Sequence, residues 1–305
     1  YGIQTYISNP FSRFQRIDFG LTWHNISYDI LDRVINTFGQ EELIKRPGSS
    51  SKFSTILPTA SWVIDNSVFG VTGPVDGYRQ NVSITASPGW KDDFKFQTMK
   101  IDARKYWRIG RDYTIALRGF FGSSQGKNAQ KFYLGGTPYL LTDFQSGSTN
   151  GVSDPSSYRS VIADTSNSNI ITDVYFTEYA YPMRGARFAE RIGTYAALFN
   201  FEVRFPFINY LALGFPLKLV LGNIRGHAFM DIGAAWDNNN EFSNNSWPDK
   251  YGSNNLGNFS PSAVTTGLGA KINLGYFLLR IETAWDRNPG GYSKPQWYLS
   301  LGPDW

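Results

Sequence analysis

Three charged residues stand out because of the short segments that surround them. Arg184 opens an Arg-Gly pair in the loop-like segment 183–188. Glu202 lies in an alternating run of apolar and polar residues, and Asp231 lies in the Phe-x-Asp-x-Gly segment 229–233. A guanidinium group binds carboxylates through paired, charge-assisted hydrogen bonds. The chemistry that these residue types offer is therefore a firm polar contact between side chains.

Other reactive chemistry is scarce in this sequence. The chain has no cysteine, and neither of its two histidines, His24 and His227, has a nucleophile motif beside it. A Gly-x-Ser-x-Gly motif is absent, and the segment 267–269 begins an alternating strand where a phosphate-binding loop would need a helix. We therefore expect both histidines to lie in the wall of the fold. We also expect a protein that is not an enzyme and that has no metal site or cofactor.

Charge and hydropathy exclude further classes. The 305 residues include 29 Lys and Arg against 25 Asp and Glu, and the basic residues are scattered rather than gathered in a stripe. Nucleic acid is therefore not an expected partner. The sequence has no apolar run of about 18 residues, which excludes a transmembrane helix.

The elements that must position the charged residues are strands. Apolar and polar residues alternate with the period of a β-strand in the segments 16–23, 94–98, 113–119, 199–205, 279–285 and 297–301. Turn signals and polar stretches, such as 145–172, separate these segments. The sequence therefore predicts an all-β fold.

The polar face of these strands bears charge at mid-strand positions, including Glu202, Arg204, Arg280 and Glu282. In a soluble secreted sandwich or jelly roll, which is one interpretation, such residues would face bulk water. In a wide membrane barrel they would line a hydrated lumen. Short turns on one side and long polar loops on the other favour the barrel.

The C-terminal segment favours the same interpretation. Trp297, Leu299 and Leu301 alternate with polar residues, Gly302 follows, and the sequence ends at Trp305. This pattern resembles the strand signal at the end of bacterial outer-membrane barrels. Trp and Tyr residues also flank many of the predicted strands, as interfacial girdles require. We therefore expect a protein of the bacterial outer membrane in contact with its lipid.

Three segments, taken in order, resemble the bacterial surface antigen superfamily of outer-membrane barrels, which includes BamA-type assembly factors and two-partner secretion transporters. They are the Gly pair that ends 132–136, the Arg-Gly of 183–188 followed by the strand with Glu202, and the Phe-x-Asp-x-Gly of 229–233. The resemblance is clear from about residue 113 onward. It implies a transmembrane antiparallel β-barrel of about 16 strands, with a loop inserted into the lumen.

In that family the loop arginine meets acids on the inner wall. Carried over to this sequence, Arg184 and Gly185 form the loop motif, Asp231 and Gly233 belong to the wall strand, and Glu202 is a second wall acid. The resemblance thus implies a loop lock, in which each charge-assisted bond contributes about 1–3 kcal/mol. The alternative is that Arg184 lies on a solvated external loop and that Asp231 faces water.

The sequence departs from the family pattern in two places. Residues 137–183 form a long loop insertion between the Gly pair and the Arg-Gly motif, and Ala186 occupies the place of an aromatic residue. We expect residues 1–305 to form one outer-membrane barrel domain. The family's POTRA domains, or another N-terminal domain, are not present in this chain and would precede it.

The function implied by the resemblance is to help insert or transport other proteins at the outer membrane. A weak seam between the first strand, near 14–26, and the last, near 296–305, would serve client barrel or secreted proteins, and accessory lipoproteins would be further partners. Two alternatives stay open. The barrel could be a translocation pore for one dedicated exoprotein, or a membrane anchor for a separate N-terminal domain such as a patatin-type phospholipase.

Overall fold

The computed structural model describes residues 1–29, 31–35, 41–45, 51–89, 94–137, 140–145, 178–186, 191–214, 219–237, 262–288 and 291–302. Strands and their connections make up this part of the chain, which confirms the all-β prediction. Among these residues we find no helix long and apolar enough to cross a membrane.

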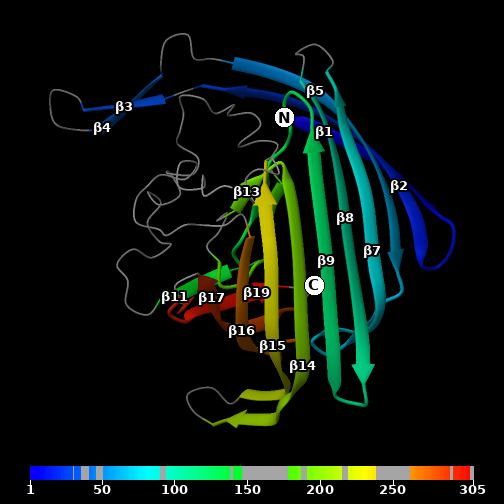
Figure 1. Cartoon of the computed structure of the whole chain (residues 1–305), viewed down its shortest axis with the longest axis vertical. Coiled ribbons are helices and arrows are strands. Elements are labelled where there is room, and N and C mark those ends of the chain that lie inside the picture. Colours follow the sequence, from blue (N-terminus) through cyan, green and yellow to red (C-terminus); the bar gives the residue numbers. More distant parts are fainter. Residues whose placement is uncertain are drawn as a thin grey trace.

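Twelve strands follow one another in a single strongly curved antiparallel sheet (Figure 1). In spatial order they are β1 (Gly2–Pro10), β2 (Gln15–Tyr28), β5 (Ser51–Asp65), β7 (Gly73–Pro88), β8 (Lys95–Ile109), β9 (Tyr113–Gln125), β14 (Tyr195–Leu213), β15 (Leu219–Trp236), β16 (Ser262–Asn273), β17 (Leu278–Asn288), β19 (Gln296–Gly302) and β11 (Leu140–Gln145). The expected number of about 16 strands and the closure of the sheet stay predictions.

The remaining strands are short and lie beside this sheet or in separate small sheets. Two of them pair beside the main path: β6 (Val68–Gly70) on β7, and β18 (Gly291–Tyr292) on β17. A hairpin of β3 (Leu31–Ile35) and β4 (Glu41–Lys45) projects from one end. A small separate sheet is formed by β12 (Glu178–Tyr181), β10 (Phe132–Leu134) and β13 (Arg191–Gly193), with β10 in the middle.

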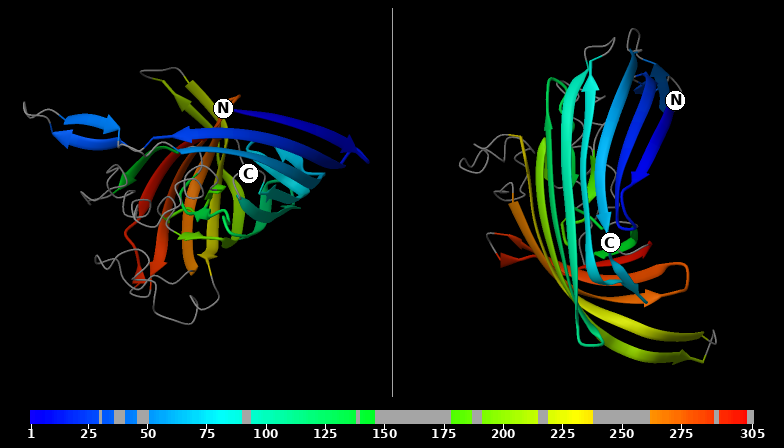
Figure 2. Two further views of the ribbon diagram at one scale, coloured as in Figure 1. Left: turned by 90° about the horizontal axis from the view of Figure 1, so that it is seen from above. Right: turned by 90° about the vertical axis from the view of Figure 1, so that its right-hand side faces the viewer.

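The two ends of the sheet differ, as the sequence predicts. At one end, here called the turn end, neighbouring strands are joined across the short segments 11–14, 66–72, 110–112, 214–218 and 274–277. At the other, the loop end, three connections are long, namely 29–50, 126–194 and 237–261, whereas 89–94 and 289–295 are short. The two views in Figure 2, from above and from the side, show the strands curving around a common concave side. That side is the expected lumen.

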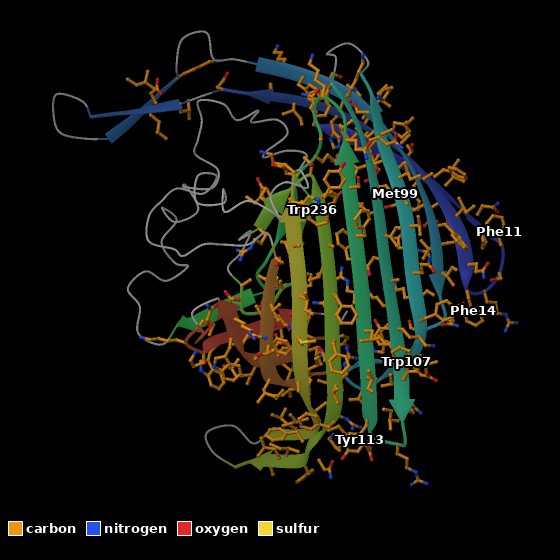
Figure 3. All side chains as sticks on the ribbon, viewed as in Figure 1. Phe11, Phe14, Met99, Trp107, Tyr113 and Trp236 are labelled. Carbon is orange, nitrogen blue, oxygen red and sulfur yellow. The ribbon has the colours of Figure 1, made fainter. Side chains whose placement is uncertain are left out.

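The sheet is apolar on its outer face and charged on its inner face. Phe121 and Phe199 are each 40% exposed, whereas Arg118 and Arg204 on the same strands are 4% exposed. A soluble domain buries its apolar face and solvates its charges, so this arrangement is reversed. Exposed aromatic residues also lie at the turn end, among them Phe11, Phe14, Trp107 and Tyr113 (Figure 3). The surface is therefore suited to lipid.

Two details differ from the prediction. The segment 14–26 is not the first strand, because β2 pairs on both edges and β1 precedes it. The segment 2–10 shows no clear alternation that would predict β1, and all nine of its residues are exposed. The insertion 137–183 is also not all loop. Its described parts form β11, which pairs with β19, and β12, which pairs with β10.

The outward orientation of Phe199 can be tested by substitution. We expect Phe199→Arg to lower the free energy of unfolding from lipid bilayers by up to about 2–4 kcal/mol, because a cation would then face hydrocarbon. Denaturant titration of the refolded protein, followed by heat-modifiable migration on gels, measures this change. Phe199→Leu is the matched control and should stay close to wild type. Equal stability of both variants would contradict an outer face in lipid.

Candidate functional site

The segment that carries the Arg-Gly motif lies against the concave side of the sheet. A bridge joins Gly136 to Met183, with the Met183 amide donating to the Gly136 carbonyl at 3.1 Å. The Gly136 amide in turn donates to the carbonyl of Ala186 at 3.2 Å. The segment 183–186 is thus a tight turn held by the glycine pair that ends β10. The glycine pair and the Arg-Gly motif, separated by the insertion, therefore form one unit.

A dry cluster packs this turn onto the sheet. Its members come from β10, from the turn and from four strands of the wall: Phe120, Phe132, Leu134, Met183, Ala186, Ala196, Leu198, Ala235 and Ala263. Phe132, Leu134 and Met183 are fully buried. Burial of each such side chain contributes about 1.5–3 kcal/mol. Ala186, which departs from the family's aromatic, is itself buried in this cluster, and Phe188 lies outside the described residues.

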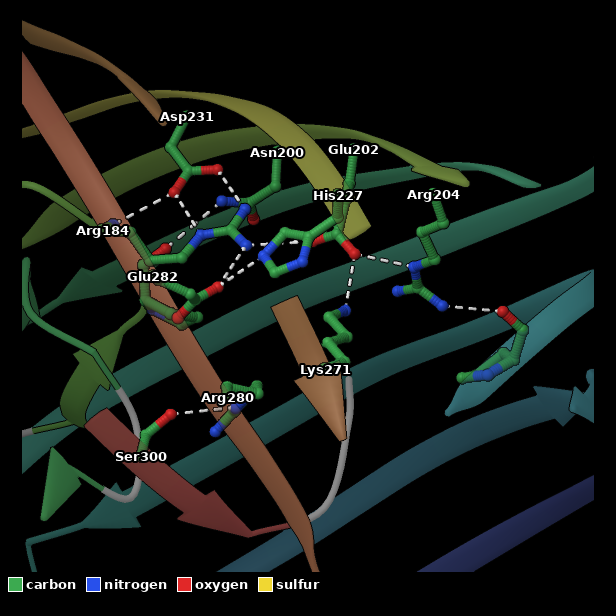
Figure 4. Close-up of polar contacts among 12 residues, drawn as sticks. Arg184, Asn200, Glu202, Arg204, His227, Asp231, Lys271, Arg280, Glu282 and Ser300 are labelled. Atoms are coloured by element: carbon green, nitrogen blue, oxygen red, sulfur yellow. Dashed lines mark hydrogen bonds and ion pairs between the residues drawn. The ribbon is translucent and has the colours of Figure 1, made fainter. Parts of the chain in front are cut away.

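Arg184 and Asp231 make the central contact of the site (Figure 4). The Arg184 Nε and Nη2 atoms donate to Asp231 Oδ2 at 3.0 Å and Oδ1 at 2.9 Å, which is the planar, two-bond geometry that guanidinium and carboxylate groups favour. The Arg184 backbone amide also donates to Asp231 Oδ2 at 3.0 Å. One carboxylate therefore fixes both the side chain and the main chain of the turn.

The third nitrogen of this guanidinium forms hydrogen bonds with two further carboxylates. Arg184 Nη1 donates to Glu202 Oε2 at 2.9 Å and to Glu282 Oε1 at 3.2 Å. The guanidinium carbon lies 3.6 Å from the centre of the Phe229 ring, which places a cation over an aromatic face. Both Arg184 and the acids are almost completely buried. The structure thus brings together Arg184, Asp231 and Glu202, and it adds Glu282.

Other side chains of the wall complete the charge balance. Glu202 Oε1 accepts from Lys271 Nζ at 2.5 Å and from Arg204 Nε at 2.7 Å. His227 Nε2 lies 2.8 Å from Glu282 Oε1. Three carboxylates therefore face the three fixed cations Arg184, Arg204 and Lys271. This group, with His227, is called the lumen network below. Buried charges are tolerated when they are paired in this way.

The two glycines of the motifs are required by space and conformation. Gly185 has a φ of +92°, and a Cβ atom there would lie 3.0 Å from the Cβ of Ala284. A Cβ atom on Gly233 would lie 2.6 Å from Leu134 Cδ2 and 3.0 Å from Met183 Sδ. The absence of a side chain at Gly233 therefore lets β10 and the turn approach the wall closely.

The residues predicted for the C-terminal strand signal lie in β19. Trp297 is 44% exposed, and Leu299 and Leu301 are half-buried in alternation with the buried Tyr298 and Ser300. Gly302 ends the strand, and Trp305 lies outside the described residues. These residues lie in a strand that pairs with β17 on one edge and with β11 on the other. The part of the chain that the structure describes contains no cluster of three or more acidic or histidine residues arranged to hold a metal ion.

An antiparallel sheet with an apolar outer face, a charged concave face and a loop anchored inside defines the class as a membrane β-barrel protein. The Omp85 superfamily domain matches residues 1–305, so the chain belongs to the Omp85 superfamily, whose members are outer-membrane β-barrel proteins. This confirms the resemblance found in the sequence. It also confirms the predicted location in the bacterial outer membrane.

Two solved structures share this fold. BamA from Haemophilus ducreyi lacking POTRA domains 1–3 gives a TM-score of 0.56 at 13% identity, over 99% of this chain and 54% of that chain. CdiB from Acinetobacter baumannii gives a TM-score of 0.50 at 12% identity, over 98% of this chain and 41% of that chain. The chain therefore spans about half the length of that BamA structure. No relative of curated function matches it in sequence.

Sequence reasoning missed several members of the site. Glu282 and Arg204 were assigned to a charged lumen face but not to the contact with Arg184. Lys271 and Phe229 were not assigned any role in it. Alternation along the segment 262–273 could have placed Lys271 on the inner face. In the structure Lys271 lies opposite Arg225 and Arg280 of the neighbouring strands. The side-chain partners across the lumen cannot be read from alternation.

Removal of the central guanidinium should be costly. We expect Arg184→Ala to destabilise the folded protein by about 3–5 kcal/mol, because buried carboxylates would lose their shared partner. Arg184→Lys should recover part of this loss, since an ammonium keeps the charge but not the paired geometry. Unfolding in denaturant measures both. Arg111→Ala, on the exposed β8–β9 turn, is the control. If Arg184→Ala matched that control, the network would not stabilise the fold.

Gly233 gives a second test of the same packing. We expect Gly233→Ala to destabilise the protein by about 1–3 kcal/mol, because the added methyl group overpacks the contact with Leu134 and Met183. The matched control is Gly119→Ala in β9, where an added Cβ meets no atom within 4 Å. Equal unfolding midpoints for the two variants would argue against close packing of the turn on β15.

Proposed function

We propose that this chain is an outer-membrane barrel that helps to insert or transport other proteins, without making or breaking covalent bonds. The Omp85 superfamily, to which the chain belongs, is a family of outer-membrane protein assembly and translocation. The observation that carries the proposal is the buried contact of Arg184 with Asp231, Glu202 and Glu282. It holds a loop element inside the concave face, as a protein with a controlled lumen requires.

The proposed role of the lock is to keep the lumen narrow while the barrel is at rest. The turn 183–186 and the dry cluster around it occupy the concave side towards the loop end. In a hydrated pore, water would compete for the hydrogen bonds of such a loop. Here the Arg184 guanidinium is almost fully buried and has several partners, which hold the loop in one position. The lock therefore favours a regulated barrel over an open passive pore.

We further propose that the seam of the barrel lies between β1 and β19. Among the described strands, β1 pairs along one edge only and all nine of its residues are exposed. An unpaired edge offers backbone donors and acceptors to another strand. The other edge of β19 carries β11 over a short register with an irregularity between Leu140 and Thr142. The proposed mode of action is that a client strand adds by β-augmentation to the free edge of β1, or to the edge of β19 once β11 is displaced from it.

The partners follow from this mechanism. They are client barrel or secreted proteins, accessory lipoproteins at the barrel, and outer-membrane lipid around the apolar face. Residues 1–305 are proposed to act as one barrel domain, with POTRA domains or another N-terminal domain preceding it in the whole protein. A pore for one exoprotein, or an anchor for an enzyme domain, is the alternative that the following measurement distinguishes.

Planar-bilayer conductance of the refolded protein tests the locked lumen. We expect wild type to conduct little, and Arg184→Ala and Asp231→Ala each to open larger and similar currents, because each removes one side of the same contact. Arg111→Ala serves as the control for a lost surface charge. Steady wild-type currents that neither variant changes would reject the lock and favour a passive pore or an anchor.

A further inference from the structure

A second element reaches the concave face from the turn end. Between β5 and β7 the chain forms a hairpin, in which Val68, Phe69 and Gly70 of β6 pair with Asp76, Pro74 and Gly73 of β7. Its base is marked by Gly77, with a φ of +92°, where the Asn66 amide donates to the Tyr78 carbonyl at 3.0 Å. Beyond this bend β7 continues as a strand of the wall. The segment 66–77 is called the latch hairpin below.

Two hydrogen bonds tie the latch hairpin to distant strands. Arg204 Nη1 in β14 donates to the Pro74 carbonyl at 2.8 Å, between residues 130 positions apart (Figure 4). The side-chain amide of Asn273, at the end of β16, donates to the Val71 carbonyl. Thr72, between these two contacts, is only 8% exposed. The tip of the hairpin is therefore held against the far side of the wall.

These contacts require the hairpin to cross the lumen. Along the sheet, β8, β9, β14 and β15 lie between β7 and β16, which amounts to about 24 Å at the usual strand spacing. A direct bond across that separation is possible only through the concave side. The six residue steps from Gly77 to Val71 span about 20 Å when extended, which suffices for such a chord.

The same contacts connect this hairpin to the loop lock. Glu202 accepts from Arg184 through Oε2 and from Arg204 through Oε1. Arg204 then donates to Pro74 in the hairpin. One carboxylate therefore lies between the turn that enters from the loop end and the hairpin that enters from the turn end. The turn contacts Glu202 and the hairpin contacts Arg204, two residues further along β14.

We propose that the latch hairpin closes the lumen at the turn end, and that Arg204 couples it to the loop lock through Glu202. Arg204 is in this sense a positioning residue, which holds the hairpin and orients Glu202 for Arg184. The closure rests on the hairpin's own contacts, whereas the coupling rests on the proposed locked lumen. Release of the lock would then loosen both ends together, and a client that displaced one element would weaken the other.

Thiol labelling measures the position of the hairpin without relying on current. The chain has no cysteine, so Thr72→Cys introduces a single thiol at a buried position. We expect a water-soluble maleimide to label it slowly in the otherwise wild-type barrel. Asn273→Ala should accelerate labelling about three- to tenfold, the change expected when one hydrogen bond at a partly exposed site is lost. Arg204→Met, which keeps the length of the side chain, should do the same.

A matched thiol separates local release from general unfolding. Ser83→Cys lies on the inward face of β7 and is also 8% exposed, but it lies outside the hairpin. Its labelling rate should not change with Asn273→Ala. Equal acceleration at both positions, or none at Thr72→Cys, would overturn the latch.

The coupling has its own readout. If Arg204 and Glu202 connect the two elements, Arg184→Ala should also accelerate labelling of Thr72→Cys, although the guanidinium of Arg184 donates to Asp231, Glu202 and Glu282 and not to the hairpin. Acceleration by Asn273→Ala but not by Arg184→Ala would overturn the coupling and leave the latch in place. Failure of the loop lock itself is seen separately, as unchanged conductance of Arg184→Ala.

Discussion

Every other feature of the site depends on the need to neutralise charge inside the sheet. Asp231 and Glu202 are fully buried and Glu282 is nearly so, and a carboxylate without a partner in such a place is unfavourable. A single guanidinium serves all three, and Lys271, Arg204 and His227 complete the arrangement. Because the partners come from the turn and from β14, β15, β16 and β17, the network fixes four adjacent wall strands and the loop relative to one another.

Close packing makes this arrangement possible. The turn reaches the acids because small residues line its path: Gly233 on β15 admits Leu134 and Met183, and Gly267 on β16 admits the ring of Phe229. The Phe229 ring in turn packs against the Arg184 guanidinium. Electrostatics and packing are therefore interdependent here, since the charges pair only where backbone and aromatic groups approach within contact distance.

Much of the fold was predictable from sequence, because alternation reports which face of a strand is apolar. The strands that contain Glu202, Asp231 and Trp297 were predicted at their observed positions, and the reversed polarity followed from charges at mid-strand. The family motifs also indicated the pairing partners of Arg184. Alternation carries no information on contacts across the lumen, so the roles of Lys271 and Phe229 could not be predicted. The strand β1, exposed on both faces, lacked the signal altogether.

The position of β11 has a consequence for how the chain folds. Most neighbours in the sheet are joined by hairpins, which form early because their contacts are local. Two strands are exceptions. The strand β14 pairs with β9 although a long segment separates them in sequence, and β11, from the middle of the sequence, pairs with β19 near its C-terminal end. Closing so large a loop costs entropy before any contact compensates it. We therefore expect the pairing of β11 with β19 to form late, after the neighbouring hairpins of the sheet.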